Sequence, residues 1–269
     1  MDTTSRDAAA YEGYIGRWSR VVARDFIGWL DVPPMATWHD VACGTGAIAS
    51  VVLATRAPAR VDGSDLDEAR IAFARATISD PRATFRVGGG TRIDAADDTY
   101  DAIVNGLGFP PIRETANALA EFRRVTKPGG IVAGYVWDFD GEMQLLRYFW
   151  DAASDLEAGA EDEEDLERFA ICRPDRLEAA WRDAGLTDVS VRAIDAPARF
   201  ENFEDFWTPF LSGDSPAQTH VQGLDATRRA ALRERLQHAL PIERDGSIPL
   251  VTRAWAARGT KPHGTTRGS

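Results

Sequence analysis

Glycines and carboxylates lie close together near the start of the chain, in a spacing that suits the binding of a nucleotide. The segment Thr37–Ala49 has the pattern of a short strand, a turn with Gly44 and Gly46, and the start of a helix. A helix that begins at a glycine turn offers unpaired N–H groups and the positive end of its dipole to a ligand. Asp65 follows Gly46 by nineteen residues, near the offset of about 20 residues at which a carboxylate binds ribose hydroxyls in α/β folds. These residues predict a site for a nucleotide-like cofactor.

Strand and helix patterns alternate along the chain and predict a doubly wound α/β sheet. The first five strands are predicted at residues 38–41, 59–64, 83–87, 100–105 and 131–137. A sixth strand is predicted around 189–193, and the last at 248–257. In such sheets the ligand lies beyond the carboxyl ends of the strands. We therefore expect the site at residues 43–46, 65, 89–91, 105–108 and 137–138.

The composition is that of a soluble protein that binds small molecules. Hydrophobic residues make up 44% of the chain, and no apolar run approaches the roughly 18 residues that span a bilayer. The formal net charge of -11 argues against nucleic acid as a partner, because phosphate binding depends on Lys and Arg. Met1–Arg20 lacks the pattern of a secretory signal, and the two cysteines form no disulfide framework. We expect a cytoplasmic protein without a membrane partner.

We expect a single domain over residues 1–258. Its predicted core is residues 36–138 and 174–258, and its predicted helical lid is residues 7–32, 139–172 and 200–240. In the first lid segment the apolar residues recur at steps of three and four, which is typical of an amphipathic helix. Residues 259–269 are rich in Gly and Thr and are predicted to form a disordered tail. The sequence leaves the oligomeric state open, a homodimer included.

Four motifs at matching spacing resemble those of class I S-adenosylmethionine-dependent methyltransferases. Asp40–Gly46 resembles the first motif of that family, and Gly63–Leu66 resembles its ribose-binding second motif. Tyr100–Val104 and Arg124–Gly130 resemble the signatures of its fourth strand and of the segment before its fifth strand. Within the family the chain is most similar to small-molecule enzymes of the ubiquinone/menaquinone C-methylase type. The resemblance extends over residues 38–191 and, more weakly, 248–257.

This resemblance implies both an architecture and a cofactor. The implied architecture is a Rossmann-like sheet of seven strands, mostly parallel, with the last strand antiparallel and with helical lid insertions. The implied cofactor is S-adenosylmethionine. Ala42, Gly44 and Gly46 would line its methionine part. Asp65 would bind its ribose, and Leu66 would pack on its adenine.

Two residues depart from the family pattern. Ala42 replaces the usual first glycine, and Gly89 stands where the family usually has an acid that accepts a hydrogen bond from the adenine amino group. The adenine would then be bound through backbone groups at Gly90 and Thr91, or through water. The remaining cofactor-binding candidates are Cys43, Asn105, Tyr14 and Trp18, of which the last two either close over the cofactor or simply pack in a helix.

Several residues have a structural interpretation beside a chemical one. A small residue in a tight turn is favoured for Cys43 over a nucleophile, and a hydrogen-bonded core residue is favoured for His39 over a base. His220, in a polar loop of the lid, and Asp138, after the fifth strand, are the candidates for a catalytic base. The aromatic segment Phe200–Leu211 is compatible with either a core or a substrate pocket.

These inferences favour methyl transfer from S-adenosylmethionine to a small, partly apolar acceptor. Transfer of an activated methyl group needs alignment with the acceptor, exclusion of water and, for O or C acceptors, removal of a proton. It requires neither a metal nor a catalytic triad, and the sequence has no motif typical of either. Two alternatives stay open: a fold that binds the cofactor but catalyses a non-methylating reaction, and a non-enzymatic binding or regulatory module. A nicotinamide dehydrogenase is disfavoured by Lys127–Gly130. The sequence identifies neither the acceptor nor the methylated atom.

Overall fold

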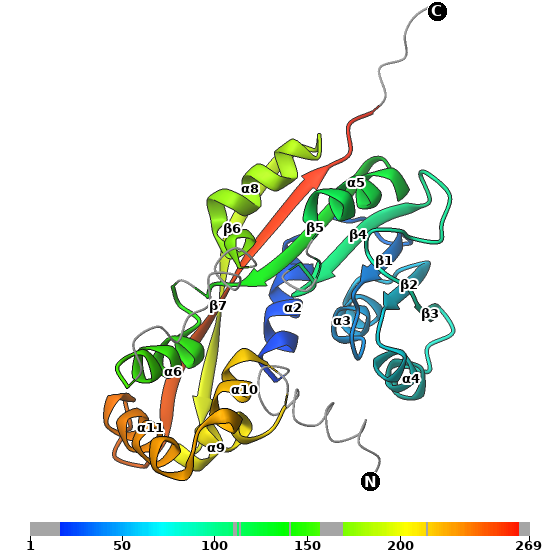
Figure 1. Ribbon diagram of the computed structural model, residues 1–269. Coiled ribbons are helices and arrows are strands. Elements are labelled where there is room, and N and C mark those ends of the chain that lie inside the picture. Colours follow the sequence, from blue (N-terminus) through cyan, green and yellow to red (C-terminus); the bar gives the residue numbers. More distant parts are fainter. Residues whose placement is uncertain are drawn as a thin grey trace, which may run out of the picture. The chain divides into compact units, whose positions relative to one another are not determined.

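A single seven-stranded sheet organises the chain (Figure 1). The computed structural model describes residues 17–109, 112, 114–139, 141–156, 169–213 and 215–263. The strand order across the sheet is β3-β2-β1-β4-β5-β7-β6. The strands are β1 (Thr37–Val41), β2 (Arg60–Asp65), β3 (Ala83–Val87), β4 (Tyr100–Gly106), β5 (Thr126–Trp137), β6 (Thr187–Phe200) and β7 (Ile248–Thr260).

Strands β1 to β5 are parallel, and their register brings the predicted ligand-binding residues to one edge. The last residue of β1, Val41, is paired with Ser64 of β2 and with Asn105 of β4. Asp65, at the end of β2, is paired with Val87 at the end of β3. Because parallel strands end on the same side, the loops that follow these four strands are neighbours.

Strand β7 runs antiparallel to β5. The Gly129 amide donates to the Lys261 carbonyl at 2.8 Å, and the Asp138 amide donates to the Arg253 carbonyl at 2.9 Å. Residue numbers thus rise along β5 as they fall along β7, which defines an antiparallel pair. The predicted fold class, a mostly parallel sheet of seven strands with an antiparallel last strand, is confirmed.

The helices follow the predicted alternation, with one exception among the described residues. They are α2 (Arg17–Trp29), α3 (Ala47–Thr55), α4 (Glu68–Thr77), α5 (Thr115–Val125), α6 (Gln144–Ser154), α8 (Pro174–Asp183), α9 (Phe203–Trp207), α10 (Pro216–Gly223) and α11 (Ala226–Ala239), with 3-10 turns at Ala170–Cys172 and Thr208–Leu211. The Asp67 carboxylate caps α4, since it accepts from the amides of Ala69 and Arg70. The exception is the connection between β3 and β4, where the described residues 88–99 contain no helix.

Several boundaries differ from the sequence prediction. Strand β5 begins at Thr126 and not at residue 131, and β6 extends to Phe200, beyond the predicted 189–193. Helix α10 occupies a segment that was predicted as a loop. Its start is fixed by a capping box, in which the Ser215 side chain accepts from the Gln218 amide and the Gln218 side chain accepts from the Ser215 amide. At the other end of the chain, β7 continues to Thr260, so Gly259 and Thr260 belong to the sheet and not to a tail. Residues 264–269 of the predicted tail and the acidic run at 161–165 lie outside the described residues.

The chain divides into two compact units. The first, which we call the sheet unit, comprises Val22–Val136, Ala170–Ile194 and Trp255–Ser269. In it, α3 and α4 pack on β2 and β3, and α5 packs on α8. Its core includes the buried Trp181, whose indole N–H donates to the Val132 carbonyl at 2.9 Å. The expectation of one domain over residues 1–258 stays a prediction.

The second unit, which we call the aromatic unit, comprises Met1–Val21, Trp137–Phe169 and Asp195–Ala254. Its core is built from aromatic rings. The rings of Phe149 and Phe210 are stacked, with centroids 4.6 Å apart and planes at 8°, and Phe206 lies 5.5 Å from Phe210. All three side chains are fully buried. Of the two interpretations of Phe200–Leu211, the packed core is therefore the one that the structure favours.

Replacement of Phe210 by Ala should destabilise the protein strongly, because it removes a fully buried ring from a packed aromatic core. We expect the free energy of unfolding, measured by urea denaturation, to fall by about 3–5 kcal/mol. The neighbouring Leu211 is 42% exposed, so Leu211→Ala is the matched control and should cost less than about 1 kcal/mol. Similar small losses in both variants would contradict the assignment of Phe210 to the core.

Candidate functional site

The turn after β1 has a backbone that suits close approach by a ligand. Ala42, Gly44 and Gly46 have φ angles of 54°, 53° and 87°, all in the left-handed region. The Cys43 amide donates to the Ser64 carbonyl at 2.9 Å and thereby ties the turn to β2. Helix α3 begins directly after Gly46, which has no side chain to cap it, and the Asp40 carboxyl accepts from the Ala49 amide of its first turn. The first turn of α3 therefore presents its amide end at the edge of the sheet, as the sequence predicts.

Ala42 adopts the conformation that glycine would have. A left-handed φ costs an alanine roughly 1 kcal/mol relative to glycine, so something must accommodate the methyl group. That neighbour is Gly108, where an added Cβ would lie 2.8 Å from the Ala42 Cβ. The departure from the family motif thus leaves the turn intact, because a glycine on the adjacent loop provides the space.

The Asp65 carboxylate joins the two strand ends. One of its oxygens accepts from the Gly44 amide at 2.9 Å, and the other accepts from the Asp67 amide at 2.9 Å. The residue is only 7% exposed. Each carboxylate oxygen has two lone pairs, so both oxygens can accept a further hydrogen bond from a hydroxyl group. This geometry is compatible with the predicted binding of a ribose diol.

Next to Asp65, the apolar Leu66 side chain lies close to the backbone of Gly89. The Leu66 side chain is 76% exposed. A Cβ added at Gly89 would lie 3.3 Å from the Leu66 Cδ2 atom, so the two residues are in contact. The exposed Leu66 side chain thus lies next to the side-chain-free backbone of Gly89 at this edge of the sheet.

Gly90 and Thr91 occupy different environments. Gly90 is buried, and an added Cβ would lie 2.9 Å from the Ile112 side chain and 3.1 Å from that of Val41. Thr91 is exposed. The Gly90 backbone is thus fixed by packing, whereas Thr91 and the half-buried Gly89 are the accessible part of this loop.

Asn105 is fully buried, and its amide group is engaged by backbone. Its Nδ2 donates to the Val41 carbonyl at 2.9 Å, and its Oδ1 accepts from the Gly108 amide at 3.1 Å. A Cβ at Gly108 would come within 2.3 Å of the Asn105 Nδ2. Asn105 therefore holds the loop after β4 against the end of β1, and its direct contact with the cofactor stays a prediction.

Cys43 and His39 have the structural roles that the sequence favours. Cys43 is buried in the turn, and burial raises the pKa of its thiol, which makes it a poor nucleophile at neutral pH. The His39 Nε2 lies 2.9 Å from the Ser64 hydroxyl, and its ring meets the edge of the Tyr100 ring at 4.9 Å. Burial lowers the pKa of His39 to about 3, so it is neutral at physiological pH.

Asp40 is a buried acid whose role the sequence did not reveal. Its Oδ2 accepts from the Ala49 amide in the first turn of α3 at 3.1 Å, and within the described part of the chain its Oδ1 has no partner. Burial raises the pKa of Asp40 to about 8, with a smaller contribution from the charge of Asp65. The carboxyl group is thus largely protonated at neutral pH. Its hydrogen bond with the Ala49 amide stabilises the start of α3.

The two candidates for a catalytic base lie in the aromatic unit. The Asp138 carboxylate accepts from the Glu142 amide at 2.9 Å, and its carbonyl accepts from the amides of Gly141 and Met143. Asp138 is thus part of the turn that leads into α6. His220 lies on α10 and not in an exposed loop, which corrects the prediction. It is half-buried, with its ring 5.6 Å from that of Trp150.

Of the two aromatic cofactor candidates near the N-terminus, Tyr14 lies outside the described residues. Trp18, on α2, is 9% exposed and meets the Phe200 ring edge-on at 5.6 Å. Packing within the aromatic unit thus accounts for Trp18. No group of three or more His, Cys, Asp or Glu side chains among the described residues could hold a metal ion. None of the described helices has the length and apolar character needed to cross a bilayer.

Comparison with known proteins identifies relatives of this chain. Residues 39–130 match the family described as a methyltransferase domain. The demethylmenaquinone methyltransferase of Halalkalibacterium halodurans is 29% identical over 173 residues, which are 57% of this chain and 68% of that protein. Seven further curated relatives match over 36 to 48% of their own length, so most matches span less than half of the relative.

Solved structures share the fold. The crystal structure of a methyltransferase homologue from Bacillus halodurans covers 90% of this chain and 99% of its own, with a TM-score of 0.60 and 14% identity. A Haemonchus contortus phosphoethanolamine N-methyltransferase in complex with S-adenosylhomocysteine covers 97% of this chain and 58% of its own, with a TM-score of 0.57 and 16% identity. At these identities the likeness concerns the fold alone.

The Asp40→Asn variant should change how stability depends on pH. The folded-state pKa of about 8 lies above the usual value of 3.8, so the folded protein keeps a proton that the unfolded chain releases between these values. The stabilisation is complete below the usual value and is lost as the pH rises through the folded-state pKa. We expect the free energy of unfolding of the wild type to fall with rising pH, relative to Asp40→Asn, across this window. Urea denaturation of both proteins at several pH values measures it.

His39, whose lowered pKa has the opposite effect on the pH dependence, is present in both proteins and cancels in the comparison. Parallel stability curves for the wild type and the variant would show that Asp40 is ionised in the folded protein.

Proposed function

The chain belongs, through residues 39–130, to the class I S-adenosylmethionine-dependent methyltransferases, and we propose that it transfers the methyl group of that cofactor to a small, partly apolar acceptor. The observation that carries this proposal is the sheet edge at which Asp65, the Gly44–Gly46 turn and the Leu66 side chain beside Gly89 meet. These elements offer a carboxylate for a diol, helix amides for an anionic group and an exposed apolar side chain for a base.

Each part of the cofactor has a proposed partner. The methionine part would lie along Ala42, Gly44 and Gly46, where the left-handed backbone leaves room for close approach. The ribose hydroxyls would bind Asp65, and the adenine would lie on Leu66 with its amino edge toward Gly89. No side-chain acid stands at residues 88–90, so the adenine amino group would be bound by backbone carbonyls or by water.

The chemistry makes modest demands on the protein. S-adenosylmethionine supplies an activated methyl group on a sulfonium, so the chain has to align the acceptor and exclude water. The acceptor class is supported by the relatives, whose names include demethylmenaquinone methyltransferase and 2-phytyl-1,4-naphtoquinone methyltransferase. We propose an acceptor that is partly apolar for the same reason. A non-methylating reaction or a non-enzymatic binding module are the alternatives that the experiments below separate.

Isothermal titration with S-adenosylhomocysteine tests the cofactor site. Asp65→Asn should weaken binding about ten- to hundredfold, because it removes the charge from hydrogen bonds with the ribose. Asp67→Asn is the matched control two residues away, since Asp67 caps α4 and asparagine caps helices equally well. Its affinity should stay close to that of the wild type.

Cofactor binding and methyl transfer by the wild-type protein separate the proposed function from its two alternatives. If it fails to bind either S-adenosylmethionine or S-adenosylhomocysteine at millimolar concentration, the methyltransferase proposal is wrong, and the binding-module alternative gains support. If the wild type binds but releases no methylated product with any quinol or phenol, the non-methylating alternative is favoured. Equal affinities of Asp65→Asn and the wild type would refute only the ribose assignment.

Gly89→Asp should tighten binding, because it introduces a carboxylate where the adenine amino group is expected. The added Cβ meets only the Leu66 side chain, at 3.3 Å or more, and that exposed side chain can move. We expect about a tenfold gain in affinity for S-adenosylhomocysteine. S-inosylhomocysteine, which carries an oxygen in place of the amino group, should gain less, because only its ring N1–H is left to donate. Gly89→Ala controls for the side-chain bulk, and equal affinities of the Asp and Ala variants would contradict the proposed adenine position.

A further inference from the structure

The connection between β3 and β4 needs support from elsewhere, because the described residues 88–99 form no helix of their own. Its first part, Gly88–Thr91, is the proposed adenine-binding loop. Backbone amides and carbonyls in such a segment require partners, since an unpaired buried group costs free energy. The partners are supplied by α5, from residues about thirty positions further along the chain.

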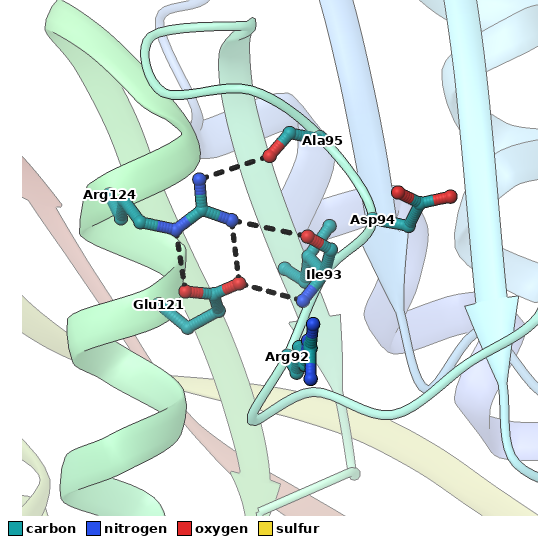
Figure 2. Close-up of a pocket in the computed structure, with 6 residues that line it drawn as sticks. All are labelled: Arg92, Ile93, Asp94, Ala95, Glu121 and Arg124. Carbon is teal, nitrogen blue, oxygen red and sulfur yellow. Dashed lines mark hydrogen bonds and ion pairs between the residues drawn. The ribbon is translucent and has the colours of Figure 1, made fainter.

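Two side chains on α5 hold the loop through its backbone (Figure 2). The Glu121 Oε1 accepts from the Ile93 amide at 2.7 Å. The Arg124 guanidinium donates to the Ile93 carbonyl at 3.1 Å and to the Ala95 carbonyl at 3.0 Å. Figure 2 shows Glu121 and Arg124 side by side, with both joined to the loop by dashed contacts.

Glu121 and Arg124 are also paired with each other, and Arg124 is paired with Asp97 near the end of the loop. The Arg124 Nε and Nη2 atoms each lie 2.7 Å from an oxygen of Glu121, which is a bidentate pairing. The Nη1 atom donates to the Asp97 carboxylate at 2.6 Å. The Arg124 side chain holds the pKa of Glu121 below its usual range, so the pair stays ionised at neutral pH. A lysine could not reproduce this planar, forked geometry.

The same helix supports the adenine loop directly. Phe122, which follows Glu121, lies under Gly90, where an added Cβ would be 3.6 Å from its ring. Arg92, Asp94 and the paired side chains line an open hollow of about 590 Å³ beside the loop. On this side the polar contacts of Glu121 and Arg124 hold the backbone at Ile93 and Ala95, whereas Gly90 and the buried Ile93 side chain are held by packing.

We propose that Glu121 and Arg124 are positioning residues for the cofactor: by fixing Ile93 and Ala95 they hold Gly89 and Thr91 where they meet the adenine. This inference rests on the proposed function, and it extends the site to two side chains that do not touch the ligand. Its consequence is specific. Loss of the pair should impair recognition of the base and leave recognition of the ribose and the amino acid, which depend on Asp65 and the turn after β1.

The test compares two ligands that differ only in the base. S-adenosylhomocysteine carries adenine, and S-ribosylhomocysteine lacks it. For Arg124→Gln we expect the preference for S-adenosylhomocysteine to shrink about tenfold, with unchanged affinity for S-ribosylhomocysteine. Glu121→Gln is a milder second variant, since it keeps an acceptor for the Ile93 amide and removes the charge partner of Arg124. Hydrogen exchange of the amides at residues 88–95 should be faster in both variants.

Arg182→Gln is the matched control. Arg182 forms an exposed pair with Glu178 on α8, so its loss removes a helical Arg–Glu pair without touching the loop. Its ligand preference and loop exchange should equal those of the wild type. An unchanged preference in folded Arg124→Gln and Glu121→Gln, or an equal loss of affinity for both ligands, would overturn the positioning role. Failure of the wild type to bind S-adenosylhomocysteine would instead overturn the proposed function.

Discussion

The Asp65 carboxylate is the interaction on which the candidate site depends. It accepts from the amides of Gly44 and Asp67, so it connects the turn after β1 with the start of the segment that leads to α4. The parallel register makes this possible, because it brings the ends of β1 and β2 side by side. The bonds from Cys43 to Ser64 and from Asn105 to Val41 complete the connection across β2, β1 and β4. The site is thus a set of backbone positions that a few buried polar groups hold in place.

Burial of polar side chains at this site costs free energy, and the structure limits that cost by neutralising the side chain or by hydrogen-bonding it. Asp40 loses its charge at neutral pH because burial raises its pKa to about 8. His39 stays neutral because burial lowers its pKa, and its ring shares a hydrogen bond with Ser64. Asn105 keeps both ends of its amide bonded to backbone. These buried polar groups therefore stabilise one geometry of the turn after β1. A preorganised binding site requires such a fixed geometry.

Local patterns predict the elements well, since alternation and helical spacing are properties of neighbouring residues. The strand at Ala83–Val87 is predicted correctly for this reason. Helix α10 was missed although its capping signal, Ser215 with Gln218, is present in the sequence, and His220 was consequently assigned to a loop. Contacts between distant residues could not be predicted. Arg124 meets Ile93 only because the fold brings α5 to the loop, and Ala42 is accommodated only because Gly108 lies opposite.

The most direct measurement is a crystal structure of the protein with S-adenosylhomocysteine. The account predicts that both ribose hydroxyls lie within hydrogen-bonding distance of the Asp65 carboxylate, with the adenine on Leu66, its amino edge toward Gly89, and the amino acid end at the turn after β1. A ligand bound with its ribose away from Asp65, or bound at another place in the chain, would contradict it.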